Sequence, residues 1–382
     1  MVKTCRPRNK LSRSLQILVT GASGFIGKNL IIRLSELPNI KTLCFTRKNN
    51  ADELLRLVAE ADVIFHMAGV NRPSNPDEFD HVNSGLTEVL CNAIRAAGRN
   101  IPLVFASSIQ AELGNPYGKS KRAAESTLES LSRQTNNDIF IYRLPGVFGK
   151  WCRPNYNSVV ATFCYSIARD LPIRVDNPDA VIELAYIDEV IDEFLSVIHQ
   201  EKVGLNVASI KKTYSISVGK LAQQIYAFKE SRANLMTERV GAGLIRALYS
   251  TYISYLPPEN FFYDLPIYGD DRGIFVEMLK TPDCGQLSFF TVHSGITRGS
   301  HYHHSKSEKF LIVKGIALMK FRNLSTGEIY EVTVSADKPR IVESIPGWVH
   351  DISNVGKEEA IIMLWANEVY DREYPDCVPC KV

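Results

Sequence analysis

The sequence lacks long hydrophobic runs, an excess of charge of one sign and a dense set of cysteines. No apolar segment reaches the roughly 20 residues that a helix needs to cross a bilayer. The 382 residues carry a formal net charge of +2, with acidic and basic residues interspersed, which argues against a nucleic-acid or membrane surface. Eight cysteines spread along the chain do not form a disulfide framework. We therefore expect a cytoplasmic protein with no nucleic-acid or membrane partner.

Each end of the chain carries one unusual segment. Residues 1–14, MVKTCRPRNKLSRS, form a basic cluster without the apolar stretch of a secretory signal, so they predict a disordered basic tail. At the other end, Cys377 and Cys380 form a C-x-x-C pair. Such a pair can bind a metal or act as a redox pair. Over residues 373–382 we favour a solvated C-terminal tail.

The chain length predicts two domains, and the first begins with a glycine-rich turn. In LQILVTGASGFIGKNLIIRL, a short β-branched run ends at Gly21, and helical spacing begins at Phe25. Gly21 permits a tight turn, Gly24 lets backbone N–H groups approach a pyrophosphate, and Gly27 lets the helix pack on the strand. The next strand-like run, IKTLCFTR, ends in Arg47, where a cation suits the 2′-phosphate of NADP. The alternative is a solvated loop end.

Further apolar runs alternate with helical segments, which predicts a doubly wound parallel sheet with its ligand at the carboxyl ends of the strands. There, Tyr117 and Lys121 are four residues apart and share a helix face. A neighbouring ammonium favours a phenolate, so this tyrosine can exchange a proton with a substrate oxygen. Ser108, or its neighbour Ser107, can hydrogen-bond the same oxygen.

The motifs TGASGFIG, HMAG, SS, YGKSK, RLPGVFG and YIDEV resemble those of extended short-chain dehydrogenases/reductases over residues 15–250. The resemblance implies a Rossmann domain, a nicotinamide cofactor and a nucleotide-sugar substrate. It implies that Tyr117 donates the proton, that Lys121 modulates the pKa of Tyr117 and binds the ribose, and that Ser108 is the second partner of the oxygen. The spacing within FASSIQA favours Ser108 over Ser107. The loop GKWCRPNYN would face the nucleotide-sugar through Arg153 and Asn155, unless it is simply solvated. The implied cofactor-binding residues are Gly21, Ser23, Gly24, Phe25, Ile26, Gly27, Arg47, Ala68, Gly69, Tyr117 and Lys121.

Short strand-like runs separated by turn residues dominate the C-terminal part and predict a β-sandwich or barrel. His301 and His303 alternate on a strand and so point the same way. Glu308 follows after a turn, and His350 follows the bend at Pro346 and Gly347. Three imidazoles and a carboxylate predict a divalent-metal site, with zinc as the expected ion. His304 would point to the opposite face and is expected to be a surface histidine.

The two motifs that hold these residues, the second ending at Asn354, resemble those of a cupin barrel over residues 258–372. The runs D-R-G-x-F-x-E and G-x-x-R-G-x-H resemble cupins that epimerise 4-keto-6-deoxy nucleotide sugars. That resemblance implies that His301 removes a proton beside the ketone and that Arg298 contacts substrate. Whether His301 is a base or a ligand, and whether the metal is catalytic or structural, stays open.

The pairing of the two domains resembles bifunctional capsular polysaccharide enzymes of the CapF type. The resemblance implies C3 epimerisation of a UDP-2-acetamido-2,6-dideoxy-4-hexulose, then reduction of its C4 ketone by NADPH. The product would be UDP-2-acetamido-2,6-dideoxy-L-talose, on the route to N-acetyl-L-fucosamine, and the enzyme a homodimer. Two alternatives remain, namely a 4-keto-sugar reductase with a structural cupin, and a non-catalytic NADP or metal sensor.

Overall fold

The structure, a computed structural model, describes residues 14–73, 75, 78–199, 203–266, 268–270, 273–275, 279, 281, 285–368, 371 and 373–382. The predicted basic tail falls almost entirely outside these residues, as do Asp271, Arg272 and Glu277 of the D-R-G-x-F-x-E run. The chain divides into two compact units. Unit 1 comprises Met1–Pro145 and Glu189–Lys211, and unit 2 comprises Gly146–Asp188 and Lys212–Val382.

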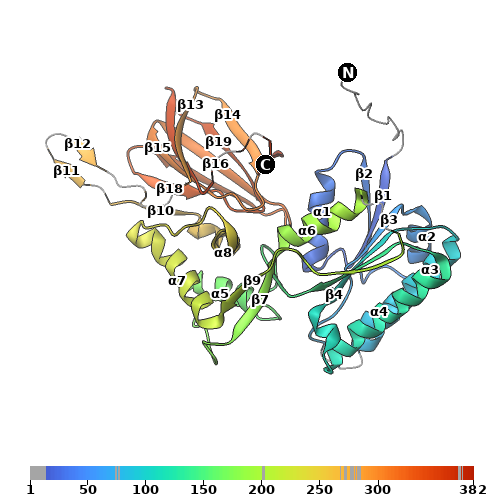
Figure 1. Ribbon diagram of the computed structural model, residues 1–382. Coiled ribbons are helices and arrows are strands. Elements are labelled where there is room, and N and C mark those ends of the chain that lie inside the picture. The colour runs from blue at the N-terminus through green and yellow to red at the C-terminus, as the bar shows by residue number, and fades with distance from the viewer. Residues whose placement is uncertain are drawn as a thin grey trace, which may run out of the picture. The chain divides into compact units, whose positions relative to one another are not determined.

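Unit 1 is built on a six-stranded parallel sheet (Figure 1). Its strand order is β2-β1-β3-β4-β5-β8. The predicted parallel sheet is confirmed. It forms because the four central strands are short runs of mostly buried apolar residues, while the two edge strands are more exposed. The strands are β1 (Leu15–Thr20), β2 (Ile40–Phe45), β3 (Val63–His66), β4 (Leu103–Ser108), β5 (Ile139–Leu144) and β8 (Leu205–Ala208).

Helices cover both faces of this sheet, so it is doubly wound as predicted (Figure 1). Alternate side chains of one strand serve opposite faces. Ile64 packs in the core beneath the helices of one face, whereas Phe65 contacts Phe194 on the other. The first face holds α2 (Ala51–Glu60), α3 (Leu86–Ala97) and α4 (Pro116–Thr135); the second holds α1 (Phe25–Ser35) and α6 (Ile187–Ser196).

The chain order reverses between β1 and β3, because β1 is followed by β2 on one side and β3 lies on the other. Open parallel sheets bind their ligands in the crevice beyond the carboxyl ends of the strands at such a point. The glycine turn that follows β1 and the segment Met67–Gly69 that follows β3 both lie there. This topology makes that edge the candidate cofactor site.

Unit 2 begins with a small sheet and three helices. The sheet contains β6 (Gly146–Phe148), β7 (Val181–Tyr186) and β9 (Tyr214–Ser217). The helices, α5 (Val159–Ile167), α7 (Val218–Asn234) and α8 (Gly243–Ser254), pack through aromatic pairs such as Phe228 and Tyr249, whose ring centroids are 5.2 Å apart. This unit cuts across the predicted 15–250 domain, because these elements bond directly to the C-terminal sheets, as Ser250 Oγ does to Ser305 O.

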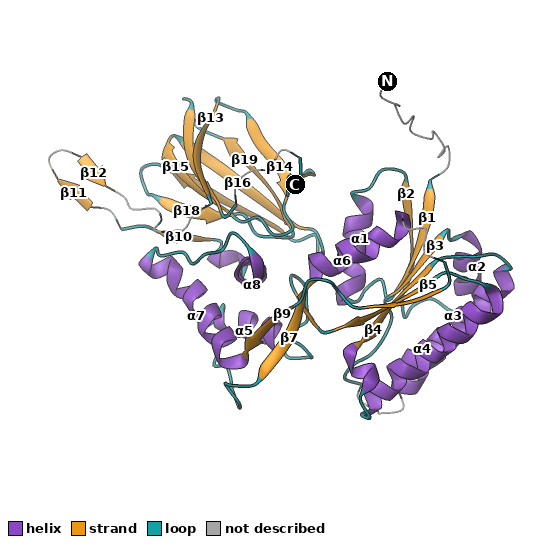
Figure 2. Cartoon of the chain, in the orientation of Figure 1, coloured by secondary structure: helices purple, strands orange, loops and turns teal. Residues whose placement is uncertain are grey.

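The rest of unit 2 is an antiparallel β-sandwich (Figure 2). Phe310 of one sheet lies 5.9 Å from His350 of the other, ring centroid to ring centroid, so the core lies between them. The predicted all-β fold is confirmed, but in the described part of the chain the strands pair within two separate sheets and do not close a barrel. One sheet has the order β10 (Phe262–Asp264), β18 (Arg340–Glu343), β15 (Glu308–Lys314), β20 (Ala360–Ala366) and β13 (Gln286–Val292). The other is β17 (Ile329–Ser335), β16 (Ile316–Asn323), β19 (Trp348–Asn354), β14 (Thr297–Tyr302) and β21 (Val378–Pro379), and a separate hairpin is formed by β11 (Tyr268–Asp270) and β12 (Gly273–Phe275).

The C-terminal segment is not the solvated tail that the sequence suggested. Strand β21 pairs with β14, where Val378 lies opposite Tyr302. Cys380 N donates to Ser300 O at 2.9 Å, and both Cys377 and Cys380 are partly buried free thiols. Backbone pairing with a distant strand explains the error, because nothing local in the segment encodes it. No helix among the described residues is long and apolar enough to span a lipid bilayer.

Candidate functional site

The turn between β1 and α1 has the form expected of a phosphate-binding turn. Gly21 has a φ of +66°, and a Cβ there would lie 2.6 Å from Ala68 N, so a side chain would collide with the segment after β3. Gly24 precedes α1 and provides no side-chain cap, which leaves the first-turn amides, at Phe25 and Ile26, available to an anion. Ser23 is exposed on the same turn. These residues fit the pyrophosphate of a dinucleotide.

Arg47 lies at the same edge of the sheet. It follows β2, which pairs with β1 up to Phe45 opposite Thr20. The loop turns through hydrogen bonds from the amide and hydroxyl of Thr46 to Asn49 Oδ1, at 2.8 and 3.0 Å. Arg47 itself is exposed. A guanidinium here can reach a phosphate on the adenosine ribose, and its role stays a prediction.

Lys121 reaches the cofactor edge from helix α4 and is buried there. Its Nζ donates to Ala106 O at 2.9 Å. A Cβ on Gly69 would lie 3.0 Å from Lys121 Nζ, so the ammonium directly abuts the segment after β3. Burial lowers the pKa of Lys121 to about 8, although the Glu125 carboxylate opposes the shift. The lysine therefore stays protonated at neutral pH but close to its titration range.

Tyr117 lies one turn before Lys121 on α4 and is partly exposed. Its ring centroid is 5.9 Å from that of Phe79. A Cβ on Gly118 would lie 2.1 Å from Gln110 O, so only glycine lets α4 begin directly against the 3-10 turn Ile109–Glu112. That turn follows β4, which brings the start of α4 beside the strand end that carries Ser108.

The two serines at the end of β4 have different partners. Ser107 Oγ donates to Glu125 Oε1 at 2.5 Å and is buried with it. Ser108 Oγ instead accepts from Gln110 N at 3.2 Å, which leaves its hydroxyl proton able to donate to a ligand. This difference supports the choice of Ser108, whose role stays a prediction.

Glu125 is a buried carboxylate that the sequence reading missed. It accepts from Ser107, from Arg122 Nη1 at 2.8 Å, and from Arg143 Nε and Nη2 at 3.1 and 2.8 Å. Burial alone would raise the pKa of Glu125, but the hydrogen bonds from Arg143, Ser107 and Arg122 outweigh it and lower the pKa. The carboxylate thereby ties α4, one turn beyond Lys121, to β4 and β5.

We expect Glu125→Gln to lower the free energy of unfolding by about 3 kcal/mol at pH 7, because it leaves Arg143 partly unpaired. A native pKa below the unfolded value means that the contribution is complete above about pH 4.3 and lost as the pH falls through the native pKa. Urea denaturation at pH 7 and pH 3 measures both. Glu129→Gln, which removes a more exposed partner of Arg122 at 3.2 Å, is the control and should have little effect. An equal loss at both pH values would contradict the assignment.

His66 at the end of β3 is a second residue missed from the sequence. Its Nδ1 and Thr20 Oγ1 are 2.6 Å apart, and its Nε2 and Thr87 Oγ1 are 2.9 Å apart. Burial, with the nearby Lys121 charge, lowers the pKa of His66 to about 3, so the imidazole is neutral. It links β3 to α3 and to the last residue of β1, which directly precedes the glycine turn. The HMAG segment contained this residue, but its partners are far away in sequence.

The predicted sugar-binding residues belong to unit 2. Arg153 and Asn155 are exposed, and the Arg153 guanidinium lies 5.1 Å from the centroid of the Tyr156 ring. Asn155 has a φ of +53°, and its amide donates to Thr162 Oγ1 at 3.0 Å, which defines the loop before α5. Their contact with a nucleotide-sugar stays a prediction.

The predicted metal ligands come together in the sandwich of unit 2. Ligand atoms of His301, His303, Glu308 and His350 all lie within 4.8 Å of one another. His301 and His350 are opposite each other on the paired strands β14 and β19, with ring centroids 4.7 Å apart. Glu308 opens β15 on the other sheet, and its Oε2 is 3.0 Å from His303 Nε2. A ligand atom lies about 2.1 Å from a bound zinc ion, so two ligand atoms on opposite sides of the ion are about 4.2 Å apart. Small shifts of these side chains would therefore suffice to bind an ion.

The protonation states of this cluster also fit a divalent cation. Burial and the imidazoles of His350 and His303 lower the pKa of His301 to about 4. Burial would raise the pKa of Glu308, but His303 and His350 hold it well below its usual range. Among the described residues, His350 Nδ1 has no hydrogen-bond partner, and His350 Nε2 lies 3.4 Å from Glu308 Oε2. A neutral His301, an ionised Glu308 and a buried His350 whose Nδ1 lacks a partner suit a metal ligand set.

A cavity of about 310 Å³ opens beside the cluster. His301, Glu308 and His350 line it together with Arg298, which contributes the cation that the sequence assigned to substrate. Arg298 Nη1 donates to Thr291 O at 3.0 Å, and its guanidinium lies 5.3 Å from the centroid of the Phe290 ring. The wall is otherwise largely apolar, so a small organic ligand could lie against the cluster with Arg298 near its charged groups.

His304 lies outside the ligand set, as predicted, but it is buried and is not a surface histidine. Its Nδ1 is 3.7 Å from Asp188 Oδ1, and Asp188 accepts from buried Lys150 at 2.6 Å. The strand ends at Tyr302, so the alternation of faces on which the prediction rested does not continue to His304.

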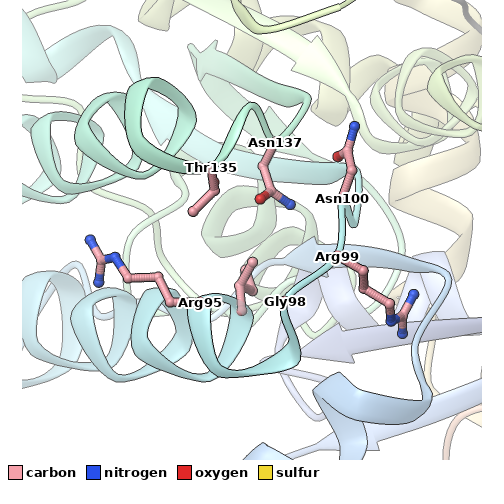
Figure 3. Close-up of a pocket in the computed structure, with 7 residues that line it drawn as sticks. Arg95, Gly98, Arg99, Asn100, Thr135 and Asn137 are labelled. Atoms are coloured by element: carbon pink, nitrogen blue, oxygen red, sulfur yellow. The ribbon is translucent and has the colours of Figure 1, made fainter.

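A second cavity lies in unit 1 and has a volume of about 250 Å³ (Figure 3). The guanidinium of Arg95 is held by Gln134 and Asn92, and that of Arg99 by main-chain oxygens at the end of α2, such as Ala59 O at 3.0 Å. The two cations are therefore committed to structural contacts, and this cavity is not a candidate ligand site.

Comparisons with known proteins identify a family for each part of the chain. A family model described as the NAD dependent epimerase/dehydratase family matches residues 17–210, and one for a polysaccharide biosynthesis C-terminal domain matches residues 268–378. UDP-2-acetamido-2,6-beta-L-arabino-hexul-4-ose reductase of Pseudomonas aeruginosa is 54% identical over 368 residues, which are 96% of this chain and 99% of that protein.

The chain is also similar to solved structures. The capsular polysaccharide assembling protein CapF from Staphylococcus aureus is 38% identical with a TM-score of 0.66, covering 96% of this chain and 100% of that chain. UDP-glucuronic acid 4-epimerase from Bacillus cereus in complex with NAD, at 18% identity and a TM-score of 0.51, covers 58% of this chain and 84% of that chain and shows the fold alone. The chain thus belongs to the NAD-dependent epimerase/dehydratase family and carries a polysaccharide biosynthesis C-terminal domain.

Proposed function

We propose that this protein reduces the C4 ketone of a UDP-2-acetamido-2,6-dideoxy-4-hexulose with NADPH, after epimerising the sugar at C3. The observation that carries the reductase half is Lys121, buried against Gly69 at the switch point of the parallel sheet, one helical turn from Tyr117. The near full-length similarity to a UDP-hexulose reductase supports the substrate class.

In the proposed reduction, the bound nicotinamide supplies the hydride that adds to C4. Tyr117 donates its phenolic proton to the former carbonyl oxygen, which becomes the C4 hydroxyl. The Lys121 ammonium stabilises the phenolate that remains. Ser108 donates a hydrogen bond to the same oxygen and orients the ketone. Arg47, with no acidic residue in its place after β2, favours NADPH over NADH.

The proposed reduction predicts that kcat/KM falls at high pH and that this fall can be assigned to one residue. Because the pKa of Lys121 is lowered to about 8, the ammonium is present below that pH and is lost above it. We therefore expect kcat/KM for NADPH-dependent reduction to fall as the pH rises through about 8. Lys119→Met, which changes an exposed lysine on the same helix, should show the same fall of kcat/KM with pH. A flat profile between pH 7 and pH 9.5 would contradict the role of Lys121.

We assign the epimerase half to the histidine cluster of unit 2. The C4 ketone acidifies the proton on C3, so inversion requires a base on one face and a proton donor on the other. His301 is the proposed base, because its imidazole is neutral and lines the cavity. A divalent cation, for which we propose zinc, would polarise the ketone oxygen when held by the other three members of the cluster, His303, Glu308 and His350, which leaves the His301 imidazole free to take the proton. Arg298 would bind the diphosphate side of the substrate.

The order of the two reactions follows from their chemistry. Reduction converts the C4 ketone to a hydroxyl, and the C3 proton then loses its acidity. Epimerisation must therefore come first, and the product would be UDP-2-acetamido-2,6-dideoxy-L-talose, which lies on the route to N-acetyl-L-fucosamine. The alternative is a reductase whose C-terminal sheets are purely structural, and one experiment separates the two functions.

The test is deuterium exchange at C3. The protein is incubated with the UDP-4-keto sugar in D2O without NADPH, and C3 is followed by NMR for native and metal-stripped protein. Uptake that is lost on stripping supports the metal-dependent epimerase, whereas uptake that survives stripping assigns the proton transfer to histidine alone. No uptake with either protein, while NADPH is still oxidised, would leave the monofunctional reductase.

A further inference from the structure

The C-terminal segment lies directly against the loop that carries the candidate metal ligands. That loop runs from His303 to Ser307 and connects β14 to β15. Strand β21 adds to the edge of β14 immediately before it, with Pro379 opposite His301. The last residues are held by Arg322, whose Nη2 donates to Lys381 O at 2.6 Å and contacts Cys380 Sγ at 3.3 Å. The chain end is thus anchored on both sides of Val378.

Asp376 points its carboxylate into the backbone of the loop. Oδ1 accepts from His304 N at 2.8 Å, and Oδ2 accepts from Ser305 N and Lys306 N, both at 2.7 Å. Ser305 Oγ adds a fourth hydrogen bond to Oδ2 at 3.1 Å. Three consecutive amides that converge on one carboxylate resemble an anion-binding nest occupied by a side chain of the same protein.

The other loop groups are bonded to elements of the sandwich and of α8. His303 O accepts from Gly347 N at 3.0 Å, and Ser305 O accepts from Ser250 Oγ. Ser307 exchanges two hydrogen bonds with Asn367, at 2.9 and 3.1 Å. Since these partners hold only the carbonyls and the end of the loop, the amides at its centre depend on Asp376.

The same residue orients a metal ligand. The main-chain carbonyl of Asp376 accepts from His303 Nδ1. His303 Nε2 lies 3.0 Å from Glu308 Oε2, so the contact at Nδ1 points the other ring nitrogen at the ligand cluster. A neutral imidazole that donates through Nδ1 offers its Nε2 lone pair to an ion there. Outer contacts of this kind set both the tautomer and the direction of a ligating imidazole.

We propose that Asp376 is a positioning residue of the metal centre, which makes the C-terminal segment a working part of that centre. Its carboxylate shapes the 303–307 loop, and its carbonyl presents His303 Nε2 to the ion. The inference rests on the metal centre of the proposed function. It gives the segment that contains Cys377 and Cys380 a role that depends on Asp376 and not on the two cysteines.

The test is metal affinity of the full chain carrying Asp376→Asn, measured for Zn²⁺ by competition with a chromophoric chelator. We expect affinity to fall about tenfold or more, the range found for contacts that orient metal ligands. The visible absorption of bound Co²⁺ should change as well, because a displaced imidazole alters the coordination geometry. Glu373→Gln is the matched control, since it removes an exposed carboxylate three residues away. It should leave both readouts unchanged.

Arg322→Ala provides a second variant in case Asp376→Asn does not fold, because it loosens the end of the segment without altering the loop. It should weaken Zn²⁺ binding by a smaller factor. Wild-type affinity and an unchanged Co²⁺ spectrum in the folded variants would overturn the inference while the metal centre stands. A wild-type protein that binds neither Zn²⁺ nor Co²⁺ would overturn the metal centre itself, and the inference with it.

Discussion

Tyr117→Phe should lower kcat for NADPH-dependent reduction of the UDP-4-keto sugar about a thousandfold. The substitution removes only the phenolic hydroxyl, so the new C4 oxygen must take its proton from water. A positioned general acid contributes about 10²- to 10⁴-fold, and the expected loss lies in the middle of that range. The ring contact with Phe79, 5.9 Å between centroids, involves no hydroxyl and should persist. NADPH oxidation followed by absorbance measures the effect.

Three comparisons make this result specific to proton donation. Binding of NADPH, followed by its fluorescence, should change little, because the glycine turn and Lys121 remain. Tyr226→Phe, which alters an exposed tyrosine on α7, should retain wild-type kcat. Exchange at C3 should also survive in Tyr117→Phe, since the proposed base His301 lies in the other unit. A loss of less than tenfold would show that another group donates the proton.

Glu308→Gln should abolish metal binding and lower C3 exchange at least about a hundredfold. Glu308 is the carboxylate of the cluster, and its Oε2 lies 3.0 Å from His303 Nε2 and 3.4 Å from His350 Nε2. A neutral amide is a poor ligand and leaves the ion's charge uncompensated in a buried site. Metal content of the purified protein and deuterium uptake at C3 are the two measurements.

The effect should stay within the C-terminal sheets. Reduction of a sugar that has already been epimerised should continue at the wild-type rate, because Tyr117 and Lys121 are unaltered. Glu328→Gln, an exposed carboxylate between β16 and β17, is the matched control. Near-ultraviolet circular dichroism of the buried Trp348 and Trp365 reports whether the sandwich is still folded. Exchange that persists in a folded, metal-free Glu308→Gln protein would assign the chemistry to histidine alone.

The parallel sheet could be predicted from the sequence because its signals are local. A β-branched run, a glycine turn and a helical period occur within twenty residues, and each follows from backbone sterics or side-chain spacing. The pairing of Tyr117 with Lys121 on one helix face is equally local. The same is true of the His301 to Glu308 run, which the structure joins to His350 by pairing β14 with β19.

The residues that were missed act through distant partners. Glu125 meets Ser107 and Arg143, each 18 residues away, and His66 meets Thr20 and Thr87. Asp376 lies about 70 residues from the loop that it holds. No periodicity within a short window encodes such pairs, because they form only when the elements pack.

The sequence by itself determined the family, the parallel sheet, the residues proposed for proton transfer and the four candidate metal ligands, because these depend on short-range spacing and on residue chemistry. The tertiary structure alone decided that the C-terminal segment is a strand, that His304 is buried, that Ser107 is committed to Glu125 and that the C-terminal strands form two sheets. Each of these outcomes depends on which strand edges and which buried polar groups meet when the elements pack. A buried polar group without a hydrogen-bond partner is energetically costly, so its partner must come from elsewhere in the chain.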